Sequence, residues 1–298
     1  MRDPEYDRFG PWMLEISEID PLPPLFVPYV STDKEPLLRV KIPRQAERRD
    51  LSPGMHMYDY VVCLYGEDME IHVRDGDSVA TFRIAYGDIV AMKNTEDLLN
   101  GHLRVYSLKY DYDIPYSTVS IDLVRRMIAV IRERYLESGD PYAAVPEGFE
   151  GAAAAEGMGF YFTGFLNALA AEHPEYGILA TQAETRVAVF ENGFWRRLFF
   201  GALDKRLLET VHLTDGRELQ IVGRGRTWAY RWNTVYGKET LYLPLAKIRS
   251  VERTPDPKNA NMVRWLFKTE VSEHSGVLRG DNPAADRYSE WLEGALTA

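Results

Sequence analysis

Histidine and cysteine are the side chains in this sequence most able to bind a transition metal or to attack a substrate. The six histidines are scattered, and no two of them lie four residues apart: His56, His72, His102, His173, His212 and His274. The single cysteine, Cys63, cannot supply a disulfide or a multi-cysteine zinc site, and its apolar run VVCLY makes it a small core residue. His212 lies in an alternating strand and is expected to be half-buried. The sequence therefore predicts no metal and no cofactor.

Patterns that would activate a nucleophile or hold a nucleotide phosphate are also absent. Neither G-x-S-x-G, H-E-x-x-H nor G-x-x-x-x-G-K-[ST] occurs. Gly157, Gly159 and Gly164 do not have the spacing of a dinucleotide-binding turn. Glu172 and His173 fit the end of a helix before a proline better than they fit a catalytic pair. We therefore predict no catalytic residue and a protein that is not an enzyme.

A strand-like stretch, GRGRTWAYRW (223–232), combines basic and aromatic side chains. Alternation places its aromatic rings on one face of a strand and Arg231 on the other. The candidate anion or acidic-peptide surface consists of Arg217, Arg224, Arg226 and Arg231. The alternative is that these arginines are solvated charges on an edge strand, where they discourage aggregation.

A second mixed segment covers residues 193–206, within GFWRRLFFGALDKRLL (193–208). Its candidate interface residues are Phe194, Trp195, Arg196, Arg197, Phe199 and Phe200. Aromatic and basic side chains together are typical of segments that lie in a membrane interface or contact a partner. The alternative is a loop or helix that covers the core and whose basic residues face water.

A third basic cluster lies in the connector that contains Arg44, Arg48 and Arg49. Because Glu47 and Asp50 are interleaved with these arginines, the pattern favours an internal network of ion pairs over a site for anions.

Length and charge narrow the range of partners. The 298 residues suggest about two domains, and the formal net charge of −10 makes nucleic acid an unfavourable partner. No run of about 20 apolar residues is present, and the first residues, MRDPEYDRFGPW, lack the apolar core of a signal peptide. With one cysteine, the chain shows no adaptation to an oxidising compartment. We expect a cytoplasmic protein, with peripheral membrane attachment as an open alternative.

The chain divides into five regions by composition and periodicity. Proline-rich residues 1–54 are expected to form an extended arm packed on the first domain, residues 55–136. In that domain, strands are followed by a helix whose apolar stripe runs from Ile121 to Tyr135. A linker rich in Gly, Ala, Pro and Glu (137–159) and a connecting helix (160–179) lead to the second domain, residues 180–298.

Two phrases of the sequence, FRIAYGDIVAMK (82–93) and LYLPLAKIRSVE (241–252), share one apolar pattern. The pattern aligns Phe82 with Leu241, Ile84 with Leu243, Tyr86 with Leu245, Ile89 with Ile248 and Met92 with Val251. Upstream, CLYGEDMEIHV matches HLTDGRELQIV with a one-residue gap, and each copy ends in one helix. The pattern predicts a mainly antiparallel α+β protein in which a curled sheet sealed by a helix occurs twice. A continuous sheet shared by both halves would contradict this prediction.

Strands that end in one helix, with the phrases YGDIVAMK and LAKIRSVE, resemble the pleckstrin-homology-like (PH-like) superfold, here as two barrels or sandwiches in tandem. The opening YDRFGPWMLEISEIDPLPPLF and the stretch IPRQAERRDLSPGMHMYDYVV resemble a family of uncharacterised bacterial proteins. The resemblance implies binding of lipids, peptides or proteins, and no activity. Phosphoinositide binding would require several Lys and Arg in the first hairpin loop, where this chain has the acidic turn Gly66-Glu67-Asp68.

Three function classes follow from these observations. The leading hypothesis is a binding or scaffold protein that docks a protein or peptide partner. The first alternative is peripheral membrane association through residues 193–206, and the second is an enzyme of unrecognised type. The sequence does not identify the partner or the oligomeric state.

Overall fold

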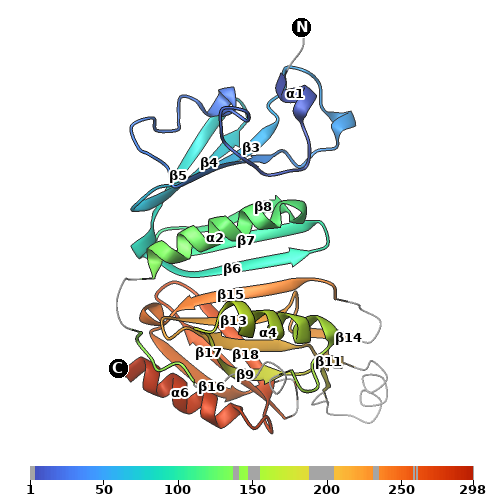
Figure 1. Ribbon diagram of the computed structural model, residues 1–298, viewed down its shortest axis with the longest axis vertical. Coiled ribbons are helices and arrows are strands. Elements are labelled where there is room, and N and C mark those ends of the chain that lie inside the picture. The colour runs from blue at the N-terminus through green and yellow to red at the C-terminus, as the bar shows by residue number, and fades with distance from the viewer. Residues whose placement is uncertain are drawn as a thin grey trace. The chain divides into compact units, whose positions relative to one another are not determined.

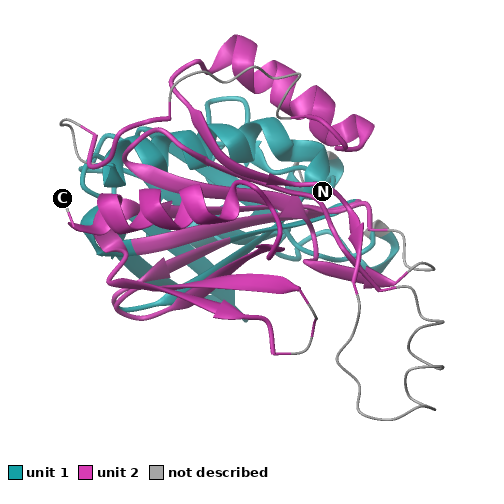
Figure 2. Cartoon of the chain, turned by 90° about the horizontal axis from the view of Figure 1, so that it is seen from below, with its two compact units in different colours: residues 1–89, 99–103, 109–137 teal, residues 90–98, 104–108, 138–298 magenta. Residues whose placement is uncertain are grey.

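The computed structural model describes residues 4–136, 141–146, 155–187, 205–230, 235–257, 259 and 261–297. The chain forms two compact units (Figure 2). Unit 1 comprises residues 1–89, 99–103 and 109–137, and unit 2 comprises residues 90–98, 104–108 and 138–298. Among the described residues, no helix has the length and apolar character needed to cross a membrane.

Unit 1 is built on an antiparallel sheet of five strands in sequence order (Figure 1). The strands are β1 (Leu14–Glu15), β2 (Leu38–Pro43), β3 (Tyr58–Leu64), β4 (Asp68–Asp75) and β5 (Ser78–Ala85). Its helical elements are α1 (Pro4–Arg8), η1 (Pro24–Phe26), η2 (Arg48–Asp50), η3 (Tyr86–Asp88), η4 (Thr118–Ser120) and α2 (Ile121–Tyr135).

Alternation along β3 gives this sheet two buried faces. Val61 and Cys63 point to one side, where they form a cluster with Phe9 and Phe26 of the amino-terminal arm. Val62, between them, points to the other side and is also fully buried. A strand buried on both faces carries a nearly continuous apolar run, which explains the sequence VVCLY.

Helix α2 lies where the apolar stripe predicted it, and it contacts β3 and η3. Ser120 occupies its N-cap position without making a side-chain cap. The Ser120 Oγ instead accepts the backbone N–H of Met13, at 2.9 Å. An ion pair of 2.8 Å between Arg126 and Glu15 gives a second link between α2 and the arm.

The largest sheet has seven strands in the order β8-β7-β6-β15-β13-β12-β9. These are β6 (Ile89–Asp97), β7 (Asn100–Ser107), β8 (Asp111–Ser117), β9 (Gly177–Gln182), β12 (Thr210–Thr214), β13 (Glu218–Arg224) and β15 (Lys238–Pro244). Strand β6 comes from the first predicted domain and pairs with β15 of the second. This pairing contradicts the expectation that the two halves share no sheet. Its physical reason is that each strand offers the other an open edge of unpaired backbone groups.

Unit 2 contains two further sheets of three strands, in the orders β16-β17-β18 and β10-β11-β14. Their strands are β16 (Ser250–Pro255), β17 (Met262–Lys268), β18 (Glu273–Arg279), β10 (Thr185–Arg186), β11 (Lys205–Leu207) and β14 (Trp228–Tyr230). The helical elements are α4 (Phe160–Glu172), η5 (Leu245–Lys247) and α6 (Ala285–Thr297).

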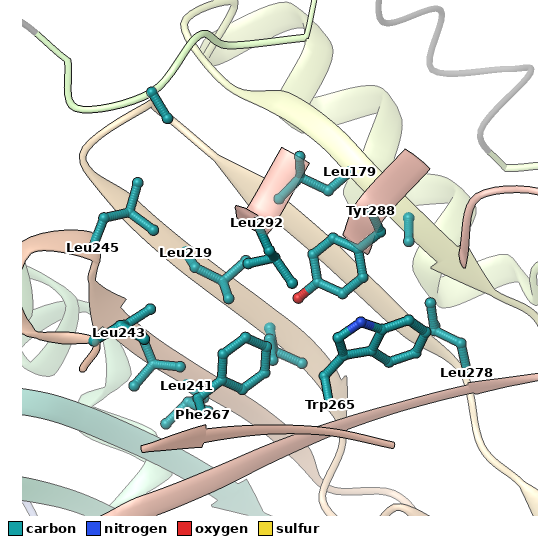
Figure 3. Close-up of a cluster of buried hydrophobic side chains, with 14 of the residues drawn as sticks. Leu179, Leu219, Leu241, Leu243, Leu245, Trp265, Phe267, Leu278, Tyr288 and Leu292 are labelled. Atoms are coloured by element: carbon teal, nitrogen blue, oxygen red, sulfur yellow. The ribbon is translucent and has the colours of Figure 1, made fainter. Parts of the chain in front are cut away.

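The main core of unit 2 gathers side chains from β13, β15, β17, β18 and α6 (Figure 3). Trp265, Phe267, Tyr288 and Leu292 lie in its centre and point toward one another. A second cluster on the other face of β12 and β13 joins Val211 to residues of α4. Helix α6 therefore covers one face of these strands, and α4 covers the other.

The prediction of a mainly antiparallel α+β fold is confirmed. The described strands form open sheets, so the expected closed barrels are not found in this part of the chain. Unit 1 ends at residue 137, where the linker was predicted to begin, but residues 90–98 and 104–108 belong to unit 2.

Candidate functional site

A groove of about 710 Å³ opens on unit 1 and is the candidate binding site. Four segments supply its walls: residues 9–12 of the arm, residues 42–47 at the end of β2, Leu99 with Asn100, and residues 115–119 at the end of β8. The volume lies within the range of about 300–1,000 Å³ that ligand pockets occupy.

Exposed apolar side chains line the groove. Trp12 is 49 % exposed, Val119 is 56 % exposed and Leu99 is 67 % exposed. Large apolar side chains that remain exposed together mark surfaces that contact another molecule. The groove therefore offers several apolar contacts to a ligand that contains an apolar group.

Gly10 supports the position of the Trp12 ring. A Cβ atom added at Gly10 would lie 1.8 Å from Trp12 Cζ3 and 1.9 Å from Trp12 Cε3. The ring therefore lies directly on the backbone of Gly10, and only glycine leaves the space it needs. This close approach places an aromatic face at the edge of the groove.

Arg44 brings the positive charge of the groove. Its backbone N–H donates to Met57 O at 2.9 Å, and its carbonyl accepts the N–H of Ala46 at 2.9 Å, so the main chain is held on both sides. Its side chain is half-buried and makes neither an ion pair nor a hydrogen bond within the described part of the chain. A guanidinium in this state is available to a carboxylate or phosphate of a ligand.

The expected ion-pair network of the connector is therefore incomplete. Arg49 pairs with Glu47 at 2.7 Å, as the interleaved charges predicted, but Arg44 does not take part. The side chain of Arg48 lies outside the described residues.

Prolines make the walls of the groove stiff. Pro11, Pro43 and Pro115 are among its lining residues, and each has a fixed φ angle. The bonds that tie the arm to α2 begin one residue beyond the groove, at Met13. A wall held in place in this way loses little conformational freedom when a ligand binds.

A charged cluster lies on the face of the sheet that the arm covers. Asp68 is buried and pairs with Lys34, at 3.3 Å, and with Arg83. Glu70 also pairs with Lys34, at 3.4 Å. Because these charged side chains pair with one another, we interpret the cluster as an internal ion-pair network and not as a ligand site.

Two buried side chains of types that take part in catalysis, Cys63 and His212, are uncharged near neutral pH. Burial raises the pKa of the Cys63 thiol to about 11, so the thiol carries no charge near neutral pH. Burial lowers the pKa of His212 to about 3. Among the described residues, no group of three or more His, Cys, Asp or Glu side chains is placed to hold a metal ion.

Two of the four arginines of the candidate anion surface, Arg217 and Arg224, lie at opposite ends of β13. Arg224 is committed to buried Glu209, with its Nη2 3.2 Å from Oε2, and its guanidinium lies over the ring of Tyr161. Arg217 precedes β13 and Arg224 ends it, so about 23 Å of extended chain separates them. Arg226 is exposed, and Arg231 lies outside the described residues.

The candidate interface segment, with Phe194, Trp195, Arg196, Arg197, Phe199 and Phe200, lies wholly outside the described residues.

The groove was not found from the sequence, although some of its signals were present. Trp12 stands among prolines in the arm, and Arg44 was noted as one of three basic residues. Their proximity depends on the path of the arm and on the turn before η4, which no local pattern specifies.

The structure thus shows an α+β protein with a groove lined by apolar side chains and Arg44. Comparison of the sequence with models of known protein families finds no match, and comparison with curated proteins finds none either.

Proposed function

We propose that this protein is a non-enzymatic docking module whose groove in unit 1 binds an extended segment of a partner protein. The segment carries an aliphatic or aromatic side chain next to a carboxylate. The apolar side chain contacts Trp12, Leu99 and Val119, and the carboxylate pairs with Arg44. The observation that carries the proposal is the Arg44 guanidinium, which has no partner among the described residues and lies in a groove of exposed apolar side chains.

The charge of Arg44 favours an acidic segment over a purely apolar one. A half-buried guanidinium binds a carboxylate through two parallel hydrogen bonds, which fix the direction of the ligand. Tryptophan and arginine are also the residues that most often dominate the energy of a protein interface. The anchored backbone of Arg44 supports a specific role for its side chain.

The shared seven-stranded sheet rules out two separately closed domains. We further propose that each half of the chain nevertheless repeats one PH-like order of elements. The order of elements supports this proposal. Strand β5, helix η3 and strand β6 correspond to strand β15, helix η5 and strand β16. After the one-turn helix, each copy has three strands and one longer helix. These are β6, β7, β8 and α2 in the first copy and β16, β17, β18 and α6 in the second.

Side-chain burial agrees with this correspondence at three of the five aligned pairs, and in the other two pairs one residue is buried and the other half-buried. Ile84, Tyr86 and Ile89 are buried in the first copy, and the aligned Leu243, Leu245 and Ile248 are buried in the second. Each one-turn helix is closed by the same bond, from the N–H of Ile89 or Ile248 to the first carbonyl of the turn. Domains of this kind mostly bind other molecules, which is consistent with a docking role.

Selection from a displayed library of random twelve-residue peptides tests the docking function. We expect the chain to enrich peptides that combine Phe, Leu or Trp with Asp or Glu. Trp12→Ala and Arg44→Glu should each weaken binding of an enriched peptide by roughly tenfold or more, because each removes a central contact.

Matched controls exclude a general effect on charge or surface polarity. Arg125→Glu makes the same change of charge on α2, and neither Arg125 nor its ion-pair partner Asp122 lines the groove. Ile19→Ala truncates an exposed apolar residue of the arm that is also outside the groove. Both variants should bind as the wild type does. Equal binding by all four variants, or no enriched peptide, would overturn the proposal.

Membrane association through residues 193–206 remains a separate prediction, because that segment is outside the described residues. Co-sedimentation with liposomes of wild type against Trp195→Glu tests it. Stronger binding by the wild type would support the membrane prediction.

A further inference from the structure

One strand pairing joins the two halves of the chain. Strand β6 runs antiparallel to β15, with Met92 opposite Tyr242 and Glu96 opposite Lys238. Lys93 and Glu239 add an ion pair of 2.8 Å across this junction. In the proposed duplication the first five strands of the first copy are β2 to β6, and those of the second are β9, β12, β13, β15 and β16, so β6 is the fifth strand of the first copy and β15 is the fourth strand of the second.

By the same alignment, β6 corresponds to β16 in the second copy, and β15 corresponds to β5 in the first. Among the described strands, neither β16 nor β5 has a neighbouring strand on one side. Strand β5, the fourth strand of the first copy, is the last strand of its sheet, and β16, the fifth strand of the second copy, ends another sheet. Both strands are edge strands within the described part of the chain. The residues of both strands are mostly exposed.

The free edge of β5 presents the backbone of alternate residues. Strands β4 and β5 are joined by the two-residue turn Gly76-Asp77, and Asp75 is opposite Ser78. The residues that close such a turn bond to each other, so Ser78, Ala80 and Phe82 bond to β4. The N–H and C=O groups of the residues between them, including Thr81 and Arg83, therefore point to the free edge.

The same argument identifies the outward groups of β16. The N–H of Asp256 donates to Met262 O at 2.8 Å, toward β17. At intervals of two residues, Thr254 and Glu252 also bond to β17. The backbone groups of Arg253 and Val251 therefore point to the free edge.

We propose that β16 of one molecule adds to the free edge of β5 of a second copy of this chain, as an antiparallel strand. The proposal rests on the duplication put forward under the proposed function, because it repeats the β6–β15 junction between molecules. The register of that junction, transferred by the alignment of the two phrases, places Arg83 opposite Val251, Phe82 opposite Glu252, Thr81 opposite Arg253 and Ala80 opposite Thr254.

The composition of β5 fits a strand that receives a partner. Its eight residues include Val79, Thr81, Phe82 and Ile84, which favour strands, and it contains no proline or lysine. A long edge without these protections is a template for another strand. On β16, Pro255 has no N–H, so the pairing ends at Thr254.

The contact is heterologous, because two different edges meet. After pairing, one molecule keeps a free β5 and the other keeps a free β16, so further copies add head to tail. The result is a ring if the rotation closes and an open chain if it does not.

Sedimentation velocity of the full chain tests this assembly. The wild type should form species larger than the 34.2 kDa chain, in proportions that rise with concentration. Thr81→Pro and Arg253→Pro each remove an outward N–H without removing a backbone bond inside the sheet, and each should sediment as a monomer. Thr81→Pro also removes the hydrogen bond between Thr81 Oγ1 and His72 Nδ1, which is 2.9 Å long. Thr81→Ser and Arg253→Gln keep that N–H at the same positions and should assemble as the wild type does.

A mixture of the two proline variants distinguishes head-to-tail pairing from a symmetric contact. The Thr81→Pro chain keeps its β16 and the Arg253→Pro chain keeps its β5, so together they should form a dimer and nothing larger. A wild type that is monomeric at all concentrations, or proline variants that assemble as the wild type does, would overturn the proposal. A mixture that stays monomeric, when both variants are folded by circular dichroism, would also overturn it.

Cross-linking keeps the test valid if a proline variant does not fold. Ala80 and Thr254 are exposed and would form a pair without hydrogen bonds, where Cα atoms lie about 4.5 Å apart, within reach of a disulfide. Oxidation of Ala80→Cys mixed with Thr254→Cys should give a covalent dimer, whereas either variant alone should not. Cys63 is buried and does not interfere. Equal cross-linking in the mixture and in each variant alone would contradict the proposed register.

Binding of a library-selected peptide separates this proposal from the groove. The Thr81→Pro chain should bind the peptide as the wild type does, and the Trp12→Ala chain should assemble as the wild type does. If Thr81→Pro still assembles while Trp12→Ala loses peptide binding, the strand-addition proposal fails and the groove proposal stands. If Trp12→Ala still binds the peptide while Thr81→Pro is monomeric, the groove proposal fails and the strand-addition proposal stands.

Discussion

Gly276 and His212 face each other in the core of unit 2, where a Cβ atom at Gly276 would lie 2.5 Å from His212 Cε1. The same atom would lie 3.2 Å from Ile221 Cδ1. His212 is fully buried, and its ring contacts Tyr288 edge to face, with 5.0 Å between the ring centroids. The strand β18 thus accommodates a buried imidazole by having no side chain at this position.

Replacement of Gly276 by alanine should destabilise the protein. The added methyl group meets a buried ring that cannot move into solvent, and overpacking of a core costs about 1–3 kcal/mol. Denaturant unfolding at neutral pH measures the free energy of unfolding. The control is Gly294→Ala in α6, where no atom lies within 4 Å of the new Cβ atom. Because alanine favours a helix over glycine, this control should stabilise the protein by about 0.5–1 kcal/mol.

The stability of the protein should fall as the pH falls from 7 to 5. Burial lowers the pKa of His212 from 6.5 to about 3, and that of His274 to about 4 with help from Lys93 and Arg104. Below pH 6.5 the unfolded chain binds protons that these folded residues do not bind, so stability present above pH 6.5 is lost down to the folded pKa. At pH 5 each histidine accounts for a loss of about 2 kcal/mol.

The variant His212→Leu should reduce this loss between pH 7 and pH 5 by about 2 kcal/mol, the share of one histidine. Tyr288→Phe is the matched control, because it changes the same cluster without removing a group that titrates in this range. The Tyr288 hydroxyl is buried without a hydrogen-bond partner in the described part of the chain, so its removal should leave the pH dependence unchanged. An unaltered pH dependence in His212→Leu would contradict the assignment.

Glu209 should be one of the most sensitive charged residues of unit 2. It is 4 % exposed, accepts the N–H of Gly159 at the N-cap of α4, and pairs with Arg224 at 3.2 Å. Glu209→Ala leaves the guanidinium of Arg224 without its partner and should lower the free energy of unfolding by about 3–5 kcal/mol. Glu184→Ala removes an exposed partner of Arg206 and should cost less than about 1 kcal/mol.

The fold was predictable where the spacing of apolar residues along the sequence indicates which side chains are buried. The phrase around Tyr86 and the phrase around Leu245 each became strand, one-turn helix and strand, because apolar residues at those spacings must reach one core. Helix α2 followed from its stripe in the same way. The pairing of β6 with β15 was not predictable, because an open edge consists of backbone groups that every sequence has.

The groove was less predictable than the fold, because its residues are far apart in the sequence and lie mainly in irregular segments. Trp12 and Val119 have no pattern in common, and the bond from Met13 to Ser120 that brings the arm to this end of α2 appears only in the folded structure. The role of Arg44 depended on which of the nearby acids found another partner, and Glu47 pairs with Arg49. Which acidic residue pairs with which arginine depends on the folded geometry and not on the spacing of these residues in the sequence.

Gly10→Ala should weaken peptide binding without a large loss of stability. The new Cβ atom would displace the Trp12 ring, which lies 1.8 Å from its position. Because Trp12 is 49 % exposed, the ring can swing into solvent, so the free energy of unfolding should change by less than about 1 kcal/mol. Isothermal titration with a library-selected peptide should show a loss of affinity close to that of Trp12→Ala, roughly tenfold.

The matched control for this variant is Gly66→Ala, in the turn between β3 and β4. No atom lies within 4 Å of the Cβ atom at that position, and Gly66 does not line the groove. This control should bind the peptide as the wild type does. If Gly10→Ala also binds like the wild type while Trp12→Ala does not, Trp12 contributes through its contact area alone. The position of its ring over Gly10 is then unimportant for binding.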